Sequence, residues 1–195
     1  MKRFVLVIIG LVVILGGIVQ YRRYQDSFPN PNAAVSGHIS RVTKNTPGEL
    51  ENFTVVSATP LDGNNNELVL LFRASGKGTD VHIAGYAIVK KSLFGWYMEK
   101  FQTVGRSPLP DDLMVGLDWS AGTRAVFGQV FLANAASVEA IFTDPRKGQI
   151  TVSAKIPDGN FVLFYSQFGE LLEFKIIDSQ GNVLKQYTKA ELQNR

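Results

Sequence analysis

The sequence predicts a mainly β protein: an antiparallel β-sandwich, or two small packed β subdomains, preceded by one N-terminal transmembrane helix and a short helix over residues 31–44. Three observations support this fold class. Apolar and polar residues alternate with a period of two along several segments. Turn sequences rich in Gly, Asn, Asp and Pro recur between those segments. The N-terminal residues form an apolar run that is long enough to cross a bilayer.

The apolar run FVLVIIGLVVILGGIV begins at Phe4 and ends at Val19. Together with the two residues that follow, a helix of this length spans about 27 Å, close to the roughly 30 Å of a bilayer's hydrocarbon core. We therefore expect residues 1–23 to be an uncleaved signal-anchor that contacts the lipid bilayer. A cleaved signal peptide normally has an apolar core of about 7–15 residues and a small-residue cleavage site, which the sequence lacks. A buried core helix is the other alternative, but this segment is apolar on every face.

The charges around the anchor discriminate weakly between its two orientations. Lys2 and Arg3 on one side nearly balance Arg22 and Arg23 on the other. The positive-inside rule therefore barely favours either orientation of the anchor. A short N-terminal tail before such a segment commonly stays in the cytoplasm. We therefore expect a single-pass protein of the cell membrane whose C-terminal domain is extracytoplasmic.

Composition argues against cysteine-based sites and against a nucleic-acid partner. The chain has no cysteine, which excludes disulfides and thiolate metal sites. Four of the 20 basic residues flank the anchor, which leaves 16 Lys and Arg against 17 Asp and Glu in the rest of the chain. The pI of 9.1 is therefore a property of the anchor. Because a nucleic-acid surface needs basic residues clustered on the folded domain, we expect no nucleic-acid partner.

The polar, proline-bearing residues 24–32 are typical of a linker between the anchor and a β-rich domain at residues 33–195. Asn30 is a suitable N-cap for a helix with Pro31 at its first position. Gly37 and the β-branched residues weaken that helix, so an edge strand is the alternative. The apolar residues at helical spacing are Val35, Ile39 and Val42.

The remaining elements are predicted as strands. Residues 67–73, 149–155 and 172–176 alternate between apolar and polar, so one face of each strand should be exposed to solvent. Residues 81–89 and 160–166 are apolar on both faces, which is typical of central strands. Turn signals lie at residues 62–66, 75–80, 92–95, 144–148, 158–159 and 179–182, which gives about ten short strands. Two prolines within residues 105–112 make that segment a candidate boundary between two β subdomains.

His38 and His82 are the only histidines, and neither has carboxylates at ligand spacing nearby. Zinc needs at least three protein ligands, so we predict no metal site. The polar loop 62–67 places oxygen-bearing side chains at alternate positions but has Glu67 where a calcium loop of the EF-hand type requires glycine. We interpret this loop as a polar hairpin turn.

Asp111 and Asp112, with Asp118 six residues on, form the best pair of candidate acid–base groups. They follow Pro110 in an apparent loop, where solvated carboxylates with ordinary pKa values are the default. We therefore predict no catalytic residue and no cofactor.

Residues 90–100 carry the most unusual local chemistry, because lysines and aromatic residues cluster around a predicted hairpin turn. The candidate interaction surface consists of Lys90, Lys91, Phe94, Trp96, Tyr97 and Lys100. It could contact an anionic envelope polymer, lipid headgroups or a membrane protein partner. The interpretation that we prefer is a β-hairpin whose aromatic residues pack into the core and whose lysines remain solvated, because strands favour aromatic residues.

The stretch IVKKSLFGWY at residues 88–97, with ELVLLFRA before it and DSQGNVL at residues 178–184, resembles small membrane-anchored proteins of unknown function from Gram-positive bacteria. The resemblance implies a location in the cell envelope and supplies no site residues. We therefore expect an interaction or accessory module of the envelope, to which no catalytic activity is assigned. A membrane-tethered envelope hydrolase and a sensor or signalling domain are the alternatives.

Overall fold

A computed structural model of the chain describes residues 26–44, 49–120, 124–165 and 169–193. The predicted anchor, residues 4–19, lies outside these ranges. Across the described ranges, no helix combines the length and the apolar character needed to cross a membrane.

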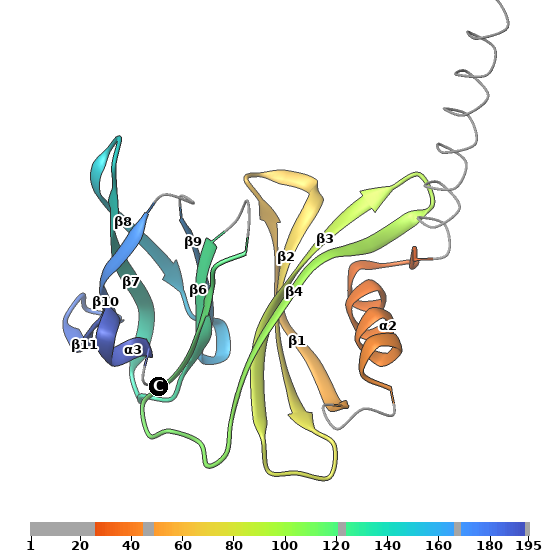
Figure 1. The fold of residues 1–195 in the computed structure, drawn as a ribbon, viewed down its shortest axis with the longest axis horizontal. Helices are drawn as coiled ribbons and strands as arrows, with labels where there is room; N and C mark the ends of the chain where they lie inside the picture. Colours follow the sequence, from red (N-terminus) through yellow and green to blue (C-terminus); the bar gives the residue numbers. More distant parts are fainter. Residues whose placement is uncertain (1–25, 45–48, 121–123, 166–168, 194–195) are drawn as a thin grey trace, which may run out of the picture.

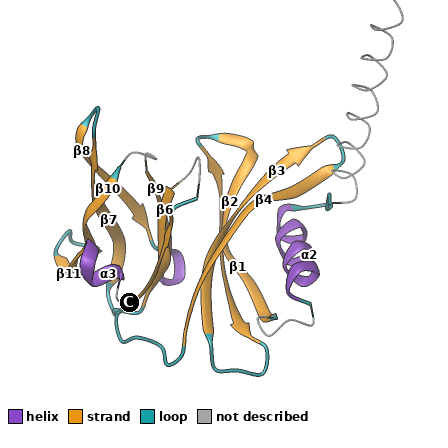
Figure 2. Ribbon diagram, viewed as in Figure 1, coloured by secondary structure: helices purple, strands orange, loops and turns teal. Residues whose placement is uncertain are grey.

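The described residues form three antiparallel sheets, which confirms the prediction of a mainly β protein (Figure 2). Sheet A is a meander of β1 (Leu50–Leu61), β2 (Asn64–Gly76), β3 (His82–Ser92) and β4 (Gly95–Arg106). Sheet B contains β5 (Leu113–Asp118), β6 (Arg124–Val130) and β9 (Asn160–Tyr165), in that spatial order. Sheet C has the order β11 (Val183–Thr188), β10 (Glu170–Asp178), β7 (Ala135–Asp144) and β8 (Gly148–Lys155). The short helices are η1 (Pro157–Gly159) and α3 (Lys189–Gln193).

The sheets are stacked in layers, with sheet B between sheets A and C and with helix α2 (Pro31–Thr43) on the outer face of sheet A (Figure 1). Successive side chains of sheet B point in opposite directions. Met114 and Phe127 pack against sheet A, whereas Leu113 and Val126 pack against sheet C. Sheet B therefore contributes to two separate hydrophobic cores, and both of its faces are covered.

Helix α2 begins and is oriented as the sequence predicts. The Asn30 side chain accepts a hydrogen bond of 2.8 Å from the Ala33 amide, and Val35 and Ile39 are buried against sheet A. Val42, the third residue of the predicted apolar face, is instead 60% exposed, because it lies in the last turn of the helix, away from that core.

Two of the predicted alternating strands differ from expectation. In β2 the residues expected on a wet face, Val69 and Leu71, are buried beneath sheet B, while Leu70 lies beneath α2. In β10 the pairing with β7 shifts between Leu171 and Glu173. Leu171 is therefore buried and Leu172 is 39% exposed, whereas the sequence pattern placed Leu172 inside. Strand β8 follows its predicted alternation.

The strand predicted at residues 160–166 was expected to be central in its sheet, and here the structure differs. Its described part, β9, lies at the edge of sheet B. It is nevertheless covered on both faces, since Leu163 faces one core and Val162 the other. The proline-bearing segment 107–112 leads from β4 of sheet A into β5 of sheet B. Among the described residues, sheets A and B share a hydrophobic core.

Candidate functional site

The predicted interaction surface lies on the β3–β4 hairpin, whose register divides it between the two faces of sheet A. Lys90 is opposite Tyr97, and Lys91 is opposite Trp96. Paired residues share a face of the sheet, so Lys90 and Tyr97 lie on the face that packs against sheet B. Lys100, paired with Ile88 beyond a β-bulge, lies on the same face. Lys91 and Trp96 lie on the side of α2. The six residues therefore do not form one continuous surface.

Two of the three lysines are held by carboxylates. The Lys90 ammonium lies 3.2 Å from Glu67 and 3.0 Å from Glu99. The hydrogen bond to Glu99 is the main reason that the pKa of Lys90 is raised above its ordinary value. The Lys100 ammonium lies 2.6 Å from Asp118. Lys91 is exposed, and its ammonium lies 6.0 Å from the centre of the Trp96 ring.

The aromatic residues of the hairpin also separate. Trp96 packs partly buried against the core beneath α2, and Tyr97 is half-buried. Phe94 lies at the turn and is 45% exposed, next to Leu93, which is 95% exposed. The solvent-accessible chemistry at the end of the hairpin therefore comes from Lys91, Leu93 and Phe94.

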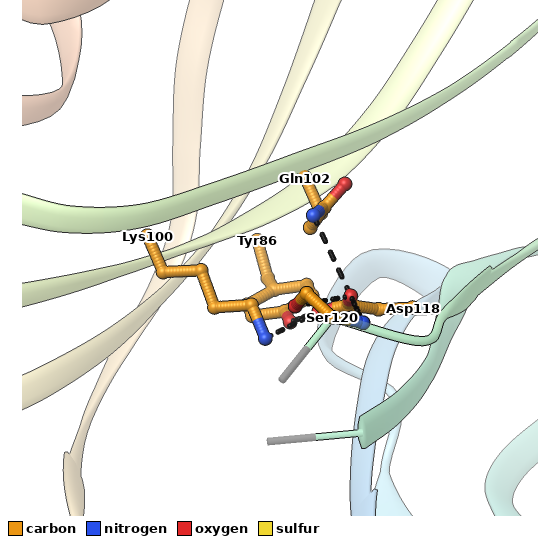
Figure 3. A network of polar contacts seen from close by, with 5 residues as sticks. All are labelled: Tyr86, Lys100, Gln102, Asp118 and Ser120. Carbon is orange, nitrogen blue, oxygen red and sulfur yellow. Dashed lines mark hydrogen bonds and ion pairs between the residues drawn. The ribbon is translucent and has the colours of Figure 1, made fainter. Parts of the chain in front are cut away.

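A polar cluster on the inner side of this hairpin joins sheet A to sheet B (Figure 3). Its centre is Asp118, the last residue of β5, whose carboxylate is almost completely buried. Asp118 Oδ2 accepts hydrogen bonds from the Tyr86 hydroxyl and from Lys100. Asp118 Oδ1 accepts from the Ser120 amide at 2.9 Å, the Ser120 hydroxyl at 2.7 Å and, more weakly, the Gln102 amide at 3.5 Å.

These donors determine the protonation states of the cluster. Burial by itself raises the pKa of Asp118, but the hydrogen bonds from Lys100, Tyr86 and Ser120 outweigh burial and lower it below its usual range. Burial, together with the hydrogen bond to Asp118, raises the pKa of Tyr86 far above that of free tyrosine. At neutral pH the cluster therefore contains an ionised Asp118 carboxylate and a neutral Tyr86 phenol.

A second cluster, which also joins an aspartate to a lysine and a tyrosine, lies at the other end of β5. Asp112 precedes the strand and is 4% exposed. Its Oδ2 accepts hydrogen bonds from the Lys185 ammonium at 2.5 Å and the Tyr187 hydroxyl at 2.8 Å, both from β11. The expectation of solvated carboxylates is therefore wrong for Asp112 and Asp118, since β5 carries both into the interfaces between sheets. It is confirmed for the exposure of Asp111.

A cleft of about 670 Å³ opens beside the Asp118 cluster. Its lining includes Lys90, Glu99, Lys100, Gln102 and Ser120, so it presents both signs of charge. The histidines lie elsewhere: His38 is on α2, where burial lowers its pKa, and His82 is exposed at the start of β3. Within the part of the chain that the structure describes, no group of three or more His, Asp or Glu side chains could hold a metal ion.

The loop at residues 62–67 is the hairpin turn that the sequence predicts. Asp62 and Gly63 have φ angles of 50° and 75° and connect β1 to β2. This conformation is typical of the Asp-Gly turns that join antiparallel strands.

Comparison with known proteins gives no relative from which a function could be carried over: no family model, curated protein or solved structure matches the chain.

Proposed function

We propose that this protein is a single-pass, membrane-anchored accessory module of the cell envelope, whose extracytoplasmic β domain acts by binding and not by catalysis. The observation that carries the proposal is the attachment of the first described residues to the β3–β4 hairpin. A domain that fixes the chain directly after a predicted membrane segment is suited to being held at a set position near the bilayer.

Several contacts make this attachment. The Phe28 amide donates to the Trp96 carbonyl at 2.7 Å, and the Trp96 amide donates to the Phe28 carbonyl at 2.8 Å. Asp26 forms an ion pair with Arg41 of α2, whose guanidinium carbon lies 5.8 Å from the centre of the Phe28 ring. The segment predicted as a linker is therefore fixed to the domain from Asp26 onward. This leaves a short stretch of chain between the domain and the predicted anchor.

The Asp118 cluster supports a binding module more than a hydrolase. A general acid or base is most effective when its pKa lies near the working pH. Here the pKa of Asp118 is lowered, that of Tyr86 is raised, and both oxygens of the carboxylate are occupied by donors of the chain itself. These groups are suited to joining two sheets. An envelope hydrolase that uses the adjacent cleft is the alternative, because the cleft offers space beside a carboxylate.

Membrane attachment is tested by expressing the full chain in bacteria and extracting the membranes with alkaline carbonate. We expect the protein to stay in the membrane fraction, and a matched chain that begins at Gln25 to be released. Protease added to intact cells after removal of the wall should digest the domain. Extraction of the full chain by carbonate would refute the anchor, and protection from protease would refute the extracytoplasmic orientation.

Catalysis is tested separately on isolated cell-wall polymers. We expect no cleavage products from the full chain in detergent. Cleavage that disappears in Asp118→Asn, while the circular dichroism of the variant stays native, would establish the hydrolase alternative.

A further inference from the structure

We propose that the tip of the β3–β4 hairpin, formed by Lys91, Leu93 and Phe94, inserts into the headgroup region of the membrane that holds the anchor. This inference rests on the proposed function, because it assumes that residues 4–19 cross that membrane. It adds a second membrane contact, which would fix the orientation of the domain as well as its distance from the bilayer.

The first argument is the composition of the tip. Leu93 is 95% exposed and Phe94 is 45% exposed, at adjacent positions of one turn. Lys91, at the base of this turn, is exposed beside the ring of Trp96. Apolar side chains next to a cation are the combination that binds at a lipid interface, where the apolar groups leave water and the cation meets anionic headgroups.

The second argument is that this turn differs from the other hairpin turns that the structure describes. Their central residues are polar, glycine or proline, at residues 62–63, 77–80, 145–147 and 179–182. The β3–β4 turn has Leu93 and Phe94 at its two central positions instead. Within sheet A, Leu93 and Phe94 are the exposed large apolar side chains; in the rest of the described chain, Trp119 and Val183 are also exposed beside turns.

The third argument is the position of this turn relative to the chain that leads to the anchor. The Ser27 and Ser92 hydroxyls are 3.4 Å apart, and Phe28 forms a β-bridge with Trp96. The Cβ of any residue replacing Gly95 would lie 2.5 Å from the Phe28 carbonyl oxygen, so glycine is what permits this close approach.

The length of the connection then limits how far the tip can be from the bilayer. The apolar run ends at Val19, Gln20 and Tyr21 complete the predicted membrane helix, and Asp26 is the first described residue. A fully extended chain over this interval reaches about 18 Å. The hairpin tip, which lies beside Ser27, is therefore kept close to the lipid headgroups. This short connection brings the lipid surface to the tip of the β3–β4 hairpin, so we propose lipid as its binding partner.

The experiment uses the absence of native cysteine, which allows one fluorescent label per molecule. The full chain carrying Leu93→Cys is labelled with a polarity-sensitive nitrobenzoxadiazole dye and reconstituted into vesicles of phosphatidylcholine and phosphatidylglycerol. The matched control is Asp80→Cys, an exposed position in the turn at the opposite end of β3. A third protein, Phe94→Cys, repeats the measurement at the other apolar position of the tip.

We expect blue-shifted emission and loss of most iodide quenching for the labels at positions 93 and 94, and solvent-like values for the label at position 80. Flotation of the vesicles measures the anchor separately. Protein that fails to float refutes the proposed function. Protein that floats while the labels at positions 93 and 94 match the control refutes insertion of the tip and leaves the anchor in place.

Discussion

Replacing Asp118 with asparagine tests whether its cluster holds sheets A and B together. The Asp118 side chain is 1% exposed, and that of its partner Lys100 is 16% exposed. Removing one member of such a buried pair leaves a charge without compensation, which typically costs about 3–5 kcal/mol. Asparagine keeps one acceptor oxygen, which can still accept hydrogen bonds from Ser120 or from Tyr86 but not from both, because they bind different oxygens of Asp118. We therefore expect a loss near the lower end, about 3 kcal/mol in the free energy of unfolding.

The double variant Asp118→Asn, Lys100→Met separates the ion pair from general disruption. With both charges removed, no buried charge is left alone, so its loss should be smaller than the sum of the two single losses by at least about 1 kcal/mol. Urea denaturation of the full chain in non-ionic detergent measures these values through the fluorescence of Trp96 and Trp119. As a control, Lys77→Met removes an exposed ion pair to Glu49 and should cost less than about 1 kcal/mol.

The lowered pKa of Asp118 also predicts how the free energy of unfolding depends on pH. The pKa of Asp118 is lowered in the folded protein, so its contribution is present above the unfolded pKa of about 3.9 and is lost as the pH falls through and below that value. Stability of the original protein should therefore decrease more steeply than that of Asp118→Asn between about pH 5 and pH 3. Additive single losses, or parallel pH profiles, would show that the cluster does not join the sheets.

Three further substitutions test other contacts. Tyr187→Phe removes a hydrogen bond to the buried Asp112 carboxylate and should lower the free energy of unfolding by about 1.5–3 kcal/mol. Tyr165→Phe should not change it measurably, because the buried Tyr165 hydroxyl has no partner among the described residues. Equal urea midpoints for the two variants would contradict this. Gly95→Ala should abolish hydrogen-exchange protection of the Phe28 amide, since its Cβ would collide with the Phe28 carbonyl; retained protection would show that the junction tolerates a side chain. Asn30→Ala should lower stability by about 1 kcal/mol through loss of the helix cap, and an unchanged unfolding curve would count against the cap.

The elements of this fold could be predicted from the sequence because their signals are local. Asn30 and Pro31 mark the start of α2 within a few residues, and Asp62-Gly63 specifies its own turn. The layers could not be predicted in the same way. Val69 and Leu71 are apolar on the face expected to be wet, but whether such a face is covered depends on strands more than forty residues away. Sequence alternation alone does not contain that information.

The two aspartate clusters were missed for the same reason. Tyr86 precedes Asp118 by 32 positions, and Tyr187 follows Asp112 by 75. One signal was available within β5. Asp118 lies four residues after Met114, so both point to the same face of a strand that is otherwise apolar. An aspartate at the position of a core residue is buried only if it is paired. Pro110 and the neighbouring Asp111 concealed this signal, because they made the whole segment resemble a loop.

The position of the clusters explains why a fold built on hydrophobic cores retains buried charge at these points. Strand β5 is an edge strand of sheet B, hydrogen-bonded along one side to β6. Hydrophobic contacts with the flanking sheets are not directional and do not by themselves fix how the layers are aligned. Asp118 ties one end of β5 to sheet A, and Asp112 ties the other end to β11 of sheet C. Because hydrogen bonds depend on distance and angle, we expect these two contacts to help fix how sheets A and C are oriented relative to β5.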